Sequence, residues 1–237
     1  MLKKGPCIRF QELKYLCLDD LPMLVGLSNT NDLLQLVEVD LSGLPNFTSI
    51  YPEYKSTSTS SDMSSSSISV IKPFFSEKVM IPKLERLQNR GMDELKNIWA
   101  PCGSREEVHA CCVRHISVSG CRNLVSMFPR NPIPLLHHLE TIFVDHCRSI
   151  EVLFDIDVGG LGEIKEGSSK LRFIRVYYSD SFREVFRLKG IINPDLIIYG
   201  FEAVEEIRIS DCLGFSLLGL IWEHISTLIQ MASITMA

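Results

Sequence analysis

The 237-residue chain lacks the positive charge and the apolar leader that would direct it to nucleic acid or to secretion. Its 24 lysine and arginine residues are outnumbered by 29 aspartate and glutamate residues, which gives a net charge of −5. No global positive field therefore attracts a phosphate backbone. The first residues, MLKKGPC, precede no long apolar run, so no secretory signal is predicted. These absences favour a cytoplasmic protein that does not bind nucleic acid.

Sequence motifs for catalysis are also missing. The chain has no glycine-rich phosphate loop followed by lysine, no G-x-S-x-G turn and no H-E-x-x-H segment. Asp155 and Asp157 resemble a pair of catalytic carboxylates, but they follow a repeat on its loop side, where we predict a solvated turn. No nucleophile, base and orienting group come together. We predict that the chain is not an enzyme, and we assign it no catalytic residue and no cofactor-binding residue.

Eight cysteines raise the question of disulfides or a metal site. Disulfides are disfavoured in a reduced compartment. Several potential metal ligands lie close together in the sequence: Cys102, His109, Cys111, Cys112 and His115. Their spacing matches no zinc motif, so we predict an inter-repeat loop there and no metal site.

What the chain does have is a recurring leucine pattern. The segment FQELKYLCLDDLPMLVGL, which begins at Phe10, and the segment LLQLVEVDLSGLPNFTSI, which begins at Leu33, carry apolar residues at the same spacings. The shared frame is L-x-x-L-x-L-x-x-(L/C)-x-x-L-x-x-L, a leucine-rich-repeat frame. Seven copies are found, at residues 10–32, 33–53, 81–101, 113–130, 136–156, 168–188 and 201–220.

This frame predicts an α/β solenoid covering residues 1–237. The L-x-L core alternates with a period of two, so each repeat supplies one short strand with its leucines facing inward. Because a single repeat cannot bury its apolar side, the repeats stack into a leucine-rich-repeat horseshoe. Its parallel sheet is concave, and irregular loops or short helices form the convex side. Seven strands about 4.8 Å apart make a face roughly 30 Å long, which fits a protein better than a metabolite.

Two segments depart from the frame. Residues 54–71 are mostly serine and threonine, so we predict a flexible insertion there. The chain from Leu213 to Ala237 is largely apolar, but Glu223 and His224 at its middle disfavour a membrane span. For residues 219–237 we predict a capping helix, a continuation of the last repeat or a truncated tail, and no stable membrane insertion.

Three cysteines and two polar residues occupy anchor positions of the frame. Cys121, Cys147 and Cys212 share one position, where we predict that a buried thiol acts as a small apolar side chain. Asn89 replaces an apolar anchor and Ser179 replaces the cysteine. At these two positions the frame predicts looser packing.

The residues between the anchors of each strand share one open face and form the predicted partner-binding surface. Three of them, Phe143, Phe173 and Tyr177, are aromatic and lie near arginine, a combination typical of protein interfaces. For any single outward residue a solvated sheet position is the favoured interpretation, whereas for the three aromatic residues together the two interpretations are nearly balanced. The predicted binding residues are Tyr15, Asp19, Glu38, Asp40, Arg86, Gln88, Arg90, His115, Phe143, Asp145, Phe173, Arg175, Tyr177, Glu206 and Arg208.

Four segments carry a resemblance to a known family. They are SVSGCRNLVSMFP at 117–129, FVDHCRSIEVLFD at 143–155, RGMDELKNIWAPC at 90–102 and RISDCLGFSLL at 208–218. Together they resemble the C-terminal leucine-rich repeats of plant intracellular immune receptors of the coiled-coil, nucleotide-binding type. Among these they are most similar to the resistance-gene-candidate family known from lettuce. The L-x-G-x-I-P signature of extracellular plant repeats is missing.

The resemblance implies a role in defence. Its expected partners are a pathogen effector or a host protein that an effector modifies, together with intramolecular contact to an upstream nucleotide-binding domain that the repeats help to hold inactive. In the family, ATP or ADP binds that separate domain, so no cofactor is expected in this chain. The chain opens in a repeat without an amphipathic cap, so we expect it to be part of a longer receptor.

One alternative reading of the repeats remains. The same fold serves generic intracellular adaptors, such as the substrate-recruiting subunits of ubiquitin ligases. An F-box-like helical segment upstream of the repeats would favour that reading, and this sequence contains none.

Overall fold

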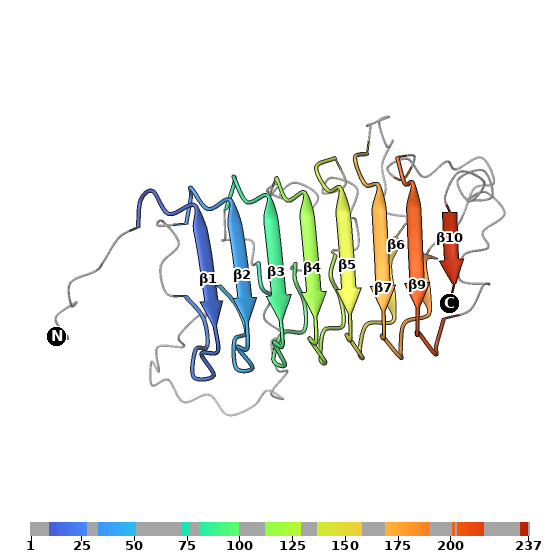
Figure 1. The fold of residues 1–237 in the computed structure, drawn as a ribbon, viewed down its shortest axis with the longest axis horizontal. Coiled ribbons are helices and arrows are strands. Elements are labelled where there is room, and N and C mark those ends of the chain that lie inside the picture. Colours follow the sequence, from blue (N-terminus) through green and yellow to red (C-terminus); the bar gives the residue numbers. More distant parts are fainter. Residues whose placement is uncertain are drawn as a thin grey trace, which may run out of the picture.

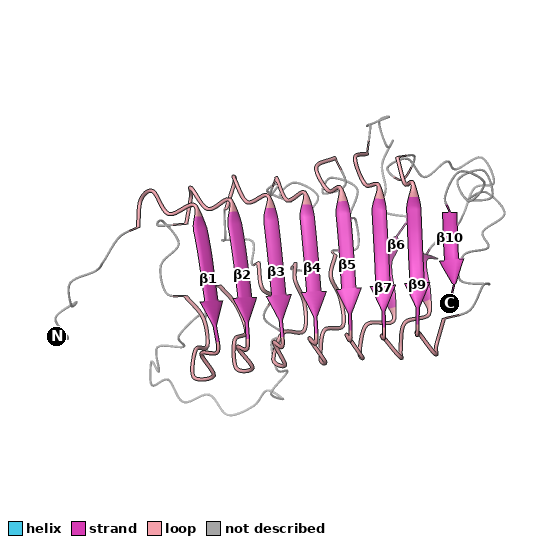
Figure 2. Ribbon diagram, viewed as in Figure 1, coloured by secondary structure: helices cyan, strands magenta, loops and turns pink. Residues whose placement is uncertain are grey.

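The computed structural model describes ten parts of the chain. They are residues 10–27, 33–50, 73–75, 81–99, 112–128, 137–157, 169–189, 201, 203–215 and 233–236. Within them the chain forms strands and turns, and no helix is found in these ranges (Figure 2). The predicted insertion at 54–71 lies outside the described residues.

One long parallel sheet runs through the molecule (Figure 1). Its eight strands follow the order β1-β2-β3-β4-β5-β7-β9-β10, so each repeat adds its strand beside that of the previous repeat. The strands are β1 (Tyr15–Asp19), β2 (Glu38–Ser42), β3 (Arg86–Arg90), β4 (His115–Ser119), β5 (Thr141–Asp145), β7 (Phe173–Tyr177), β9 (Glu206–Ser210) and β10 (Ser233–Met236). This arrangement confirms the predicted solenoid of sequential parallel strands.

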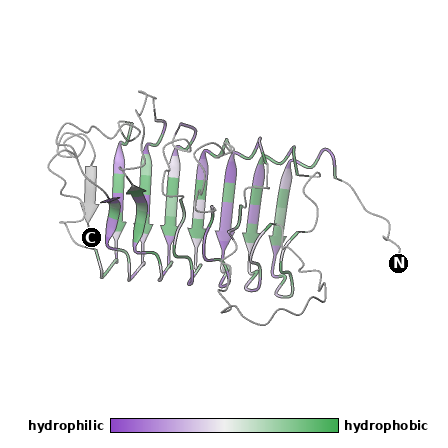
Figure 3. Cartoon of the chain, turned by 180° about the vertical axis from the view of Figure 1, so that it is seen from behind, coloured by the Kyte–Doolittle hydropathy of each residue, from purple (hydrophilic) through white to green (hydrophobic). Residues whose placement is uncertain are grey.

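The strands coincide with the L-x-L cores of the seven repeats. In β2, Val39 and Leu41 are buried while the three residues around them stay partly exposed, and β4, β5 and β7 show the same alternation. Figure 3 shows the alternation as bands of hydrophobic and hydrophilic residues along the strands. The sheet pairs in register, so Val39 lies beside Leu16 on one side and Leu87 on the other. Equivalent anchors therefore stack from repeat to repeat.

The backbone turns in the same way after each of the seven repeat strands. The residue that follows the strand has a positive φ of between 46° and 64°. These residues are Asp20, Gly43, Gly91, Gly120, His146, Tyr178 and Asp211. In the first six, the N–H donates to the carbonyl of the last strand residue of the next repeat, as in Gly43 N to Arg90 O at 3.0 Å. The turn therefore extends the hydrogen-bond ladder beyond the sheet.

A second, two-stranded sheet lies behind the main one (Figure 1). It pairs β6 (Val152–Asp157) in parallel with β8 (Glu184–Lys189). Phe154 and Ile156 are buried on it, and Lys189 Nζ donates to Asp155 Oδ2 at 2.7 Å. The predicted solvated turn at Asp155 and Asp157 is therefore wrong, because the apolar run that precedes these residues pairs as a strand.

A continuous row of buried aromatic rings fills the space between the sheet and the back of the repeats. Successive ring centroids lie 4.6 to 6.0 Å apart. We call this row the aromatic spine, and it consists of Phe47, Phe74, Phe75, Trp99, Phe128, Phe154, Phe186 and Phe201. Aromatic side chains bury a large apolar area and gain from offset and edge contacts. The spine therefore links the repeats from the second, at Phe47, to the seventh, at Phe201.

Strands β2 and β3 are 48 residues apart, counted from Glu38 to its partner Arg86, yet no described strand lies between them in the main sheet. The intervening chain contributes the short segment Phe74–Phe75, on the side of the repeats opposite the main sheet. Strand β2 pairs directly with β3. At the back, however, Phe74 N donates to Asn97 O at 2.8 Å, and Phe74 O accepts from Ile50 N at 3.3 Å. The Phe74–Phe75 segment thus separates two neighbouring repeats on one side only.

The anchor positions behave as predicted for the cysteines and differently for the polar residues. Cys121 and Cys147 are fully buried, and Cys212 is half-buried. Ser179 is also fully buried; its Oγ donates to Tyr177 O at 3.0 Å and accepts from Cys147 N at 3.2 Å. The looser packing predicted at Ser179 is wrong, because this hydroxyl hydrogen-bonds both repeats.

Asn89 is fully buried as well, in register between Leu41 and Val118 of the neighbouring strands. Neither its side-chain oxygen nor its side-chain nitrogen has a hydrogen-bond partner among the described residues. The predicted loosening at this position is not seen either. The third repeat keeps its close packing around an amide that has no partner in the described ranges.

The end of the chain is described at residues 233–236, where it forms β10 beside β9. A strand therefore occupies part of the segment for which a helix was one prediction. The rest of residues 216–237 lies outside the described residues. Among the described residues, no helix has the length and apolarity needed to cross a bilayer.

Candidate functional site

The first, third and fifth residues of β1–β5, β7 and β9 point away from the buried anchors and form what we call the open face. All fifteen predicted binding residues occupy these positions. Because the sheet pairs in register, they form three rows across the strands. The middle row consists of Cys17, Asp40, Gln88, Ser117, Phe143, Arg175 and Arg208.

On β1 to β3 the open face is polar and carries one ion pair among its described residues. Arg86 lies 3.8 Å from Glu38, and Arg90 Nη2 donates to Gln88 Oε1 at 2.8 Å. Asp40 has one carboxylate oxygen that is buried and has no partner among the described residues. This part of the face is therefore polar, with opposite charges side by side.

The middle of the face, on β4, carries smaller polar side chains and one histidine. Ser119 Oγ donates to Asp145 Oδ2 of the next strand at 3.0 Å. Burial is the main cause that lowers the pKa of His115 below its ordinary value. This imidazole is therefore uncharged at neutral pH.

Aromatic rings gather on β5 and β7. The rings of Phe143 and Tyr177 lie 5.7 Å apart and are tilted by 56°. Phe173 has the guanidinium carbon of Arg172 at 5.2 Å from its centroid and that of Arg175 at 5.4 Å. Both distances are within cation–π range. The structure thus brings two of the three aromatic residues singled out from the sequence into ring contact, and Phe173 joins them through Arg175, which lies beside Phe143.

Beside these rings, one carboxylate is shared by two arginines. Arg175 donates to Glu206 through Nε at 3.1 Å and through Nη2 at 3.4 Å, and Arg208 Nε lies 3.3 Å from the same Oε1 atom. The hydrogen bond from Arg175 is the main cause that holds the pKa of Glu206 below its ordinary value. This glutamate therefore stays ionised at neutral pH, and the cluster of three keeps one net positive charge.

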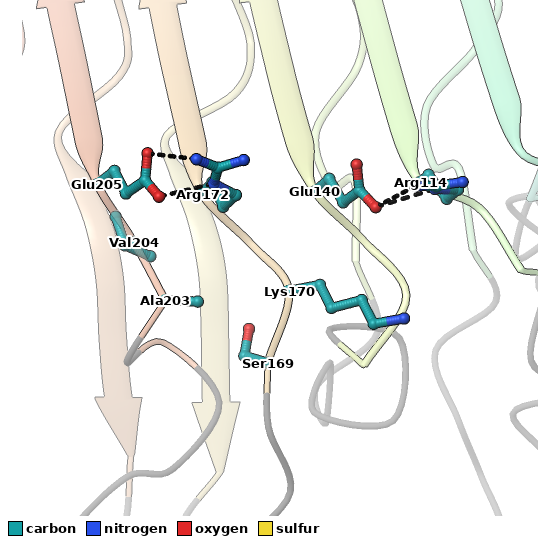
Figure 4. A pocket seen from close by; sticks show the side chains of 8 residues that line it. All are labelled: Arg114, Glu140, Ser169, Lys170, Arg172, Ala203, Val204 and Glu205. Atoms are coloured by element: carbon teal, nitrogen blue, oxygen red, sulfur yellow. Dashed lines mark hydrogen bonds and ion pairs between the residues drawn. The ribbon is translucent and has the colours of Figure 1, made fainter.

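A pocket opens at the edge where the strands begin (Figure 4). It has a volume of about 630 Å³ and is lined by Arg114, Glu140, Ser169, Lys170, Arg172, Ala203, Val204 and Glu205. Two ion pairs cross it: Arg114 Nη2 lies 2.7 Å from Glu140, and Arg172 contacts Glu205 at 2.7 and 2.9 Å. In each of these repeats the charged residue directly before the strand pairs with its counterpart in the next repeat.

These pocket residues were not predicted from the sequence. The signal was available one position upstream of each strand, where Glu85, Arg114, Glu140, Arg172 and Glu205 alternate in charge. The binding residues were predicted only from the positions between the leucines of the L-x-L core, and these charged residues lie outside that core.

Two ring-bearing residues beyond the strands were also missed. His146 and Tyr178 occupy the positive-φ turn after β5 and β7, and their rings stack with centroids 4.7 Å apart. His146 Nδ1 lies 2.8 Å from Asp145 Oδ1, and half of the Tyr178 surface is exposed. Their signal is positional: other repeats place glycine or aspartate at this point. They extend the aromatic group of β5 and β7 to the edge of the sheet at which the strands end.

The described ranges contain no group of three potential metal ligands. Of the cysteine and histidine residues considered from the sequence, Cys112 and His115 are described; Cys102, His109 and Cys111 lie outside the described residues. The prediction that this cluster forms no metal site therefore stays a prediction.

Comparison with known proteins gives one match. A family model described as plant disease resistance protein RPS2-like, leucine-rich repeats, matches residues 83–218. This range contains β3 to β9 and the aromatic group on β5 and β7. No curated protein and no solved structure matches the chain.

Proposed function

The chain belongs to the family of RPS2-like leucine-rich repeats of plant disease resistance proteins, and from this premise we propose that its open face recognises a protein during plant defence. Leucine-rich repeats of this kind form a non-catalytic family that binds proteins. The proposed partner is a pathogen effector or a host protein that an effector has modified. We also propose that the repeats belong to a cytoplasmic receptor of the coiled-coil, nucleotide-binding type, related to the lettuce resistance-gene candidates.

The observation that carries the proposal is the family match over residues 83–218, a range in which β3, β4, β5, β7 and β9 each present three outward side chains. The size of this face suits a protein partner, because a specific interface needs roughly 800 Å² from each side. The sharing of Glu206 by two arginines and the half-exposed rings of β5 and β7 are features that interface centres favour.

The proposal includes a part in autoinhibition. Contact between the repeats and an upstream nucleotide-binding domain would hold the receptor inactive until a partner competes for the repeats. Such a switch requires that the partner and the upstream domain have different affinities for the two receptor states.

The test exchanges the outward residues of β5, β7 and β9 in the receptor that carries this chain, while every buried anchor stays unchanged. We expect cell death triggered by the matching pathogen strain in leaves to be lost, with receptor abundance unchanged on immunoblots. A matched control exchanges Val125 and Leu213, which are exposed but lie off the open face. If the face exchange leaves strain-specific cell death intact, the open face is not the recognition surface.

A further inference from the structure

We infer that the part of the open face on β5, β7 and β9 receives a protein segment that carries an acidic side chain next to an aromatic or other large apolar one. This inference rests on the proposed function and specifies the location and the partner chemistry. We call the surface formed by Phe143, Phe173, Arg175, Tyr177 and Arg208 the aromatic–arginine patch.

The apolar half of the patch is formed by Phe143, Phe173 and Tyr177. All three side chains are half-buried, although no described segment covers the open face above them. Phe143 stands directly beside Arg175 in the sheet register, and Thr141 stands beside Phe173. Water contact with a group of adjacent rings is unfavourable, so an apolar side chain of a partner gains free energy by covering them.

The charged half is set by the sharing of Glu206. The Glu206 side chain is 19% exposed, whereas the side chains of Arg175 and Arg208 are 36% and 46% exposed. Arg175 makes two hydrogen bonds to this carboxylate, so Arg208 is the less engaged of the two guanidinium groups. A partner carboxylate placed at Arg208 would neutralise the remaining positive charge through a charge-assisted hydrogen bond.

Asp145, the acidic residue of the open face on β5, lies two strands away from Arg208. It accepts a hydrogen bond from Ser119 through Oδ2 and contacts His146 through Oδ1. Asp145 is thus engaged by β4 and by the residue that follows β5, and it does not compete for Arg208.

Other parts of the described surface lack this combination. On β2 and β3 the arginines contact Glu38 and Gln88, and no ring lies beside them on those strands. In the edge pocket, Arg114 and Arg172 each have their own glutamate at 2.7 Å. The aromatic–arginine patch is therefore the part of the described open face where half-buried rings lie beside a charge cluster that keeps one net positive charge.

Arginine and aromatic residues also serve single-stranded nucleic acid, so this partner class has to be weighed. Asp145 and Glu206 lie within the same three strands, and the chain carries a net charge of −5. Both carboxylates would repel the phosphates of a nucleic acid lying across these strands, whereas the proposed protein segment carries a single acidic side chain. The charges therefore favour a protein partner.

The test is a selection of short random peptides displayed on phage against the immobilised 237-residue chain. Clones that also bind the double variant Phe143→Ser/Arg208→Gln are discarded. We expect the retained peptides to share an aspartate or glutamate beside phenylalanine, tryptophan or leucine. For a synthetic peptide of this kind, we expect Arg208→Gln to weaken binding about tenfold, the size of effect given by loss of one charge-assisted contact of an interface.

Two controls keep the test specific. Arg148→Gln removes a guanidinium that is 68% exposed and lies off the open face, so it should leave the dissociation constant unchanged. Phe143→Leu keeps apolar bulk at the site, and thermal unfolding followed by circular dichroism verifies that each variant is folded.

Three results would overturn the inference. The retained peptides are basic or lack an acidic residue, no peptide is enriched over the double variant, or oligothymidylate binds the chain and is lost with Arg208→Gln. The selection needs no receptor, so it is independent of the cell-death assay. Peptide binding through Arg208 combined with unchanged strain-specific cell death would refute the proposed function and leave the patch chemistry standing.

Discussion

Individual anchor residues of this chain hydrogen-bond backward to the strand that precedes them. The Sγ atoms of Cys121, Cys147 and Cys212 lie 3.4 to 3.6 Å from the carbonyl oxygen two residues earlier, and Ser179 Oγ makes the same contact at 3.0 Å. In these four repeats the position holds a small side chain that donates a hydrogen bond, which explains why cysteine and serine both occur there. In the first three repeats it holds Leu21, Leu44 and Met92, which are apolar and cannot donate.

The first prediction concerns this position in the fifth repeat. Replacement of Cys147 by lysine should lower the free energy of unfolding by more than about 3 kcal/mol, because it leaves an unpaired charge in the core. Cys147→Ser should cost about 1–2 kcal/mol, since the equivalent Ser179 is fully buried and hydrogen-bonded. Urea unfolding of both variants checks the difference. Equal stability of the lysine variant and the unmodified chain would show that this side chain is not in the core.

The same thiol predicts a loss of stability in alkali. Its hydrogen bond with Cys121, together with burial, raises the pKa of Cys147. Above the ordinary thiol pKa of about 8.5, the unfolded chain releases a proton that the folded chain retains, so stability falls as pH rises. Urea unfolding at increasing alkaline pH should therefore show a decline that is shallower in Cys147→Ser. An identical decline in both proteins would contradict the assignment.

Asn89 gives an opportunity to stabilise the chain. Its buried amide has no partner among the described residues and lies between Leu41 and Val118. Asn89→Val should raise the free energy of unfolding by about 1–3 kcal/mol, the cost of leaving a buried polar group unsatisfied. The matched control is Gln88→Val, which changes the adjacent outward position and should have little effect. A destabilised Asn89→Val variant would show that this amide is satisfied in solution, for example by a bound water.

At the scale of structural elements, the turn after each strand repeats more strictly than its sequence does. Seven residues of four types adopt the same positive φ. Glycine reaches this conformation at no steric cost, and aspartate reaches it more easily than most residues. His146 and Tyr178 adopt it at a cost of about 1 kcal/mol or more each. At these two positions the strained backbone coincides with the stacked rings at the edge of the sheet.

Two glycines of this turn form a matched pair for mutation. A Cβ on Gly91 would meet its nearest neighbour at 3.8 Å, whereas a Cβ on Gly43 would lie 3.2 Å from the Cα and N of Asp20. Gly91→Ala should therefore cost about 1 kcal/mol from the backbone conformation alone. Gly43→Ala should cost about 1 kcal/mol more, because the backbone of the first repeat has to shift. Equal midpoints in thermal unfolding would show that the first repeat moves freely.

Across the whole molecule, the aromatic spine adds a row of ring contacts between successive repeats to the hydrogen bonds of the parallel sheet. A stack of repeats is stabilised by each unit and by each interface between units. The ring of Phe128 lies 5.5 Å from that of Trp99 and 4.9 Å from that of Phe154, and it is nearly parallel to both rings. The spine therefore couples the third, fourth and fifth repeats.

Removal of one central ring tests this coupling. Phe128→Ala should lower the free energy of unfolding by about 3–5 kcal/mol, from the lost apolar contact and the cavity that remains. Val125→Ala, at an exposed position of the same repeat, should change it by about 0.5 kcal/mol or less. A single unfolding transition that moves as a whole would support coupling along the spine. A second, separate transition in Phe128→Ala would show that the repeats on either side unfold independently.

The sequence by itself determined the repeat frame, the strand positions and the direction of each side chain on the strands. This follows from local physics, since an L-x-L core can bury its leucines in a strand only by pointing the residues between them outward. Phe143, Phe173 and Tyr177 were therefore placed on one face without any structure. The aromatic spine was not predicted, although a ring follows the last anchor at Trp99 and at Phe128.

Only the tertiary structure decided which residues meet across repeats. The pairing of β2 with β3 over a step of 48 residues, the ion pairs of the edge pocket and the sharing of Glu206 by Arg175 and Arg208 all depend on the register of separate strands. The same holds for β6 and β8, whose apolar runs read equally as loops until they pair. Spacing within a repeat determines the direction in which a side chain points. Contacts between repeats depend in addition on insertions and on the charges of both neighbouring repeats.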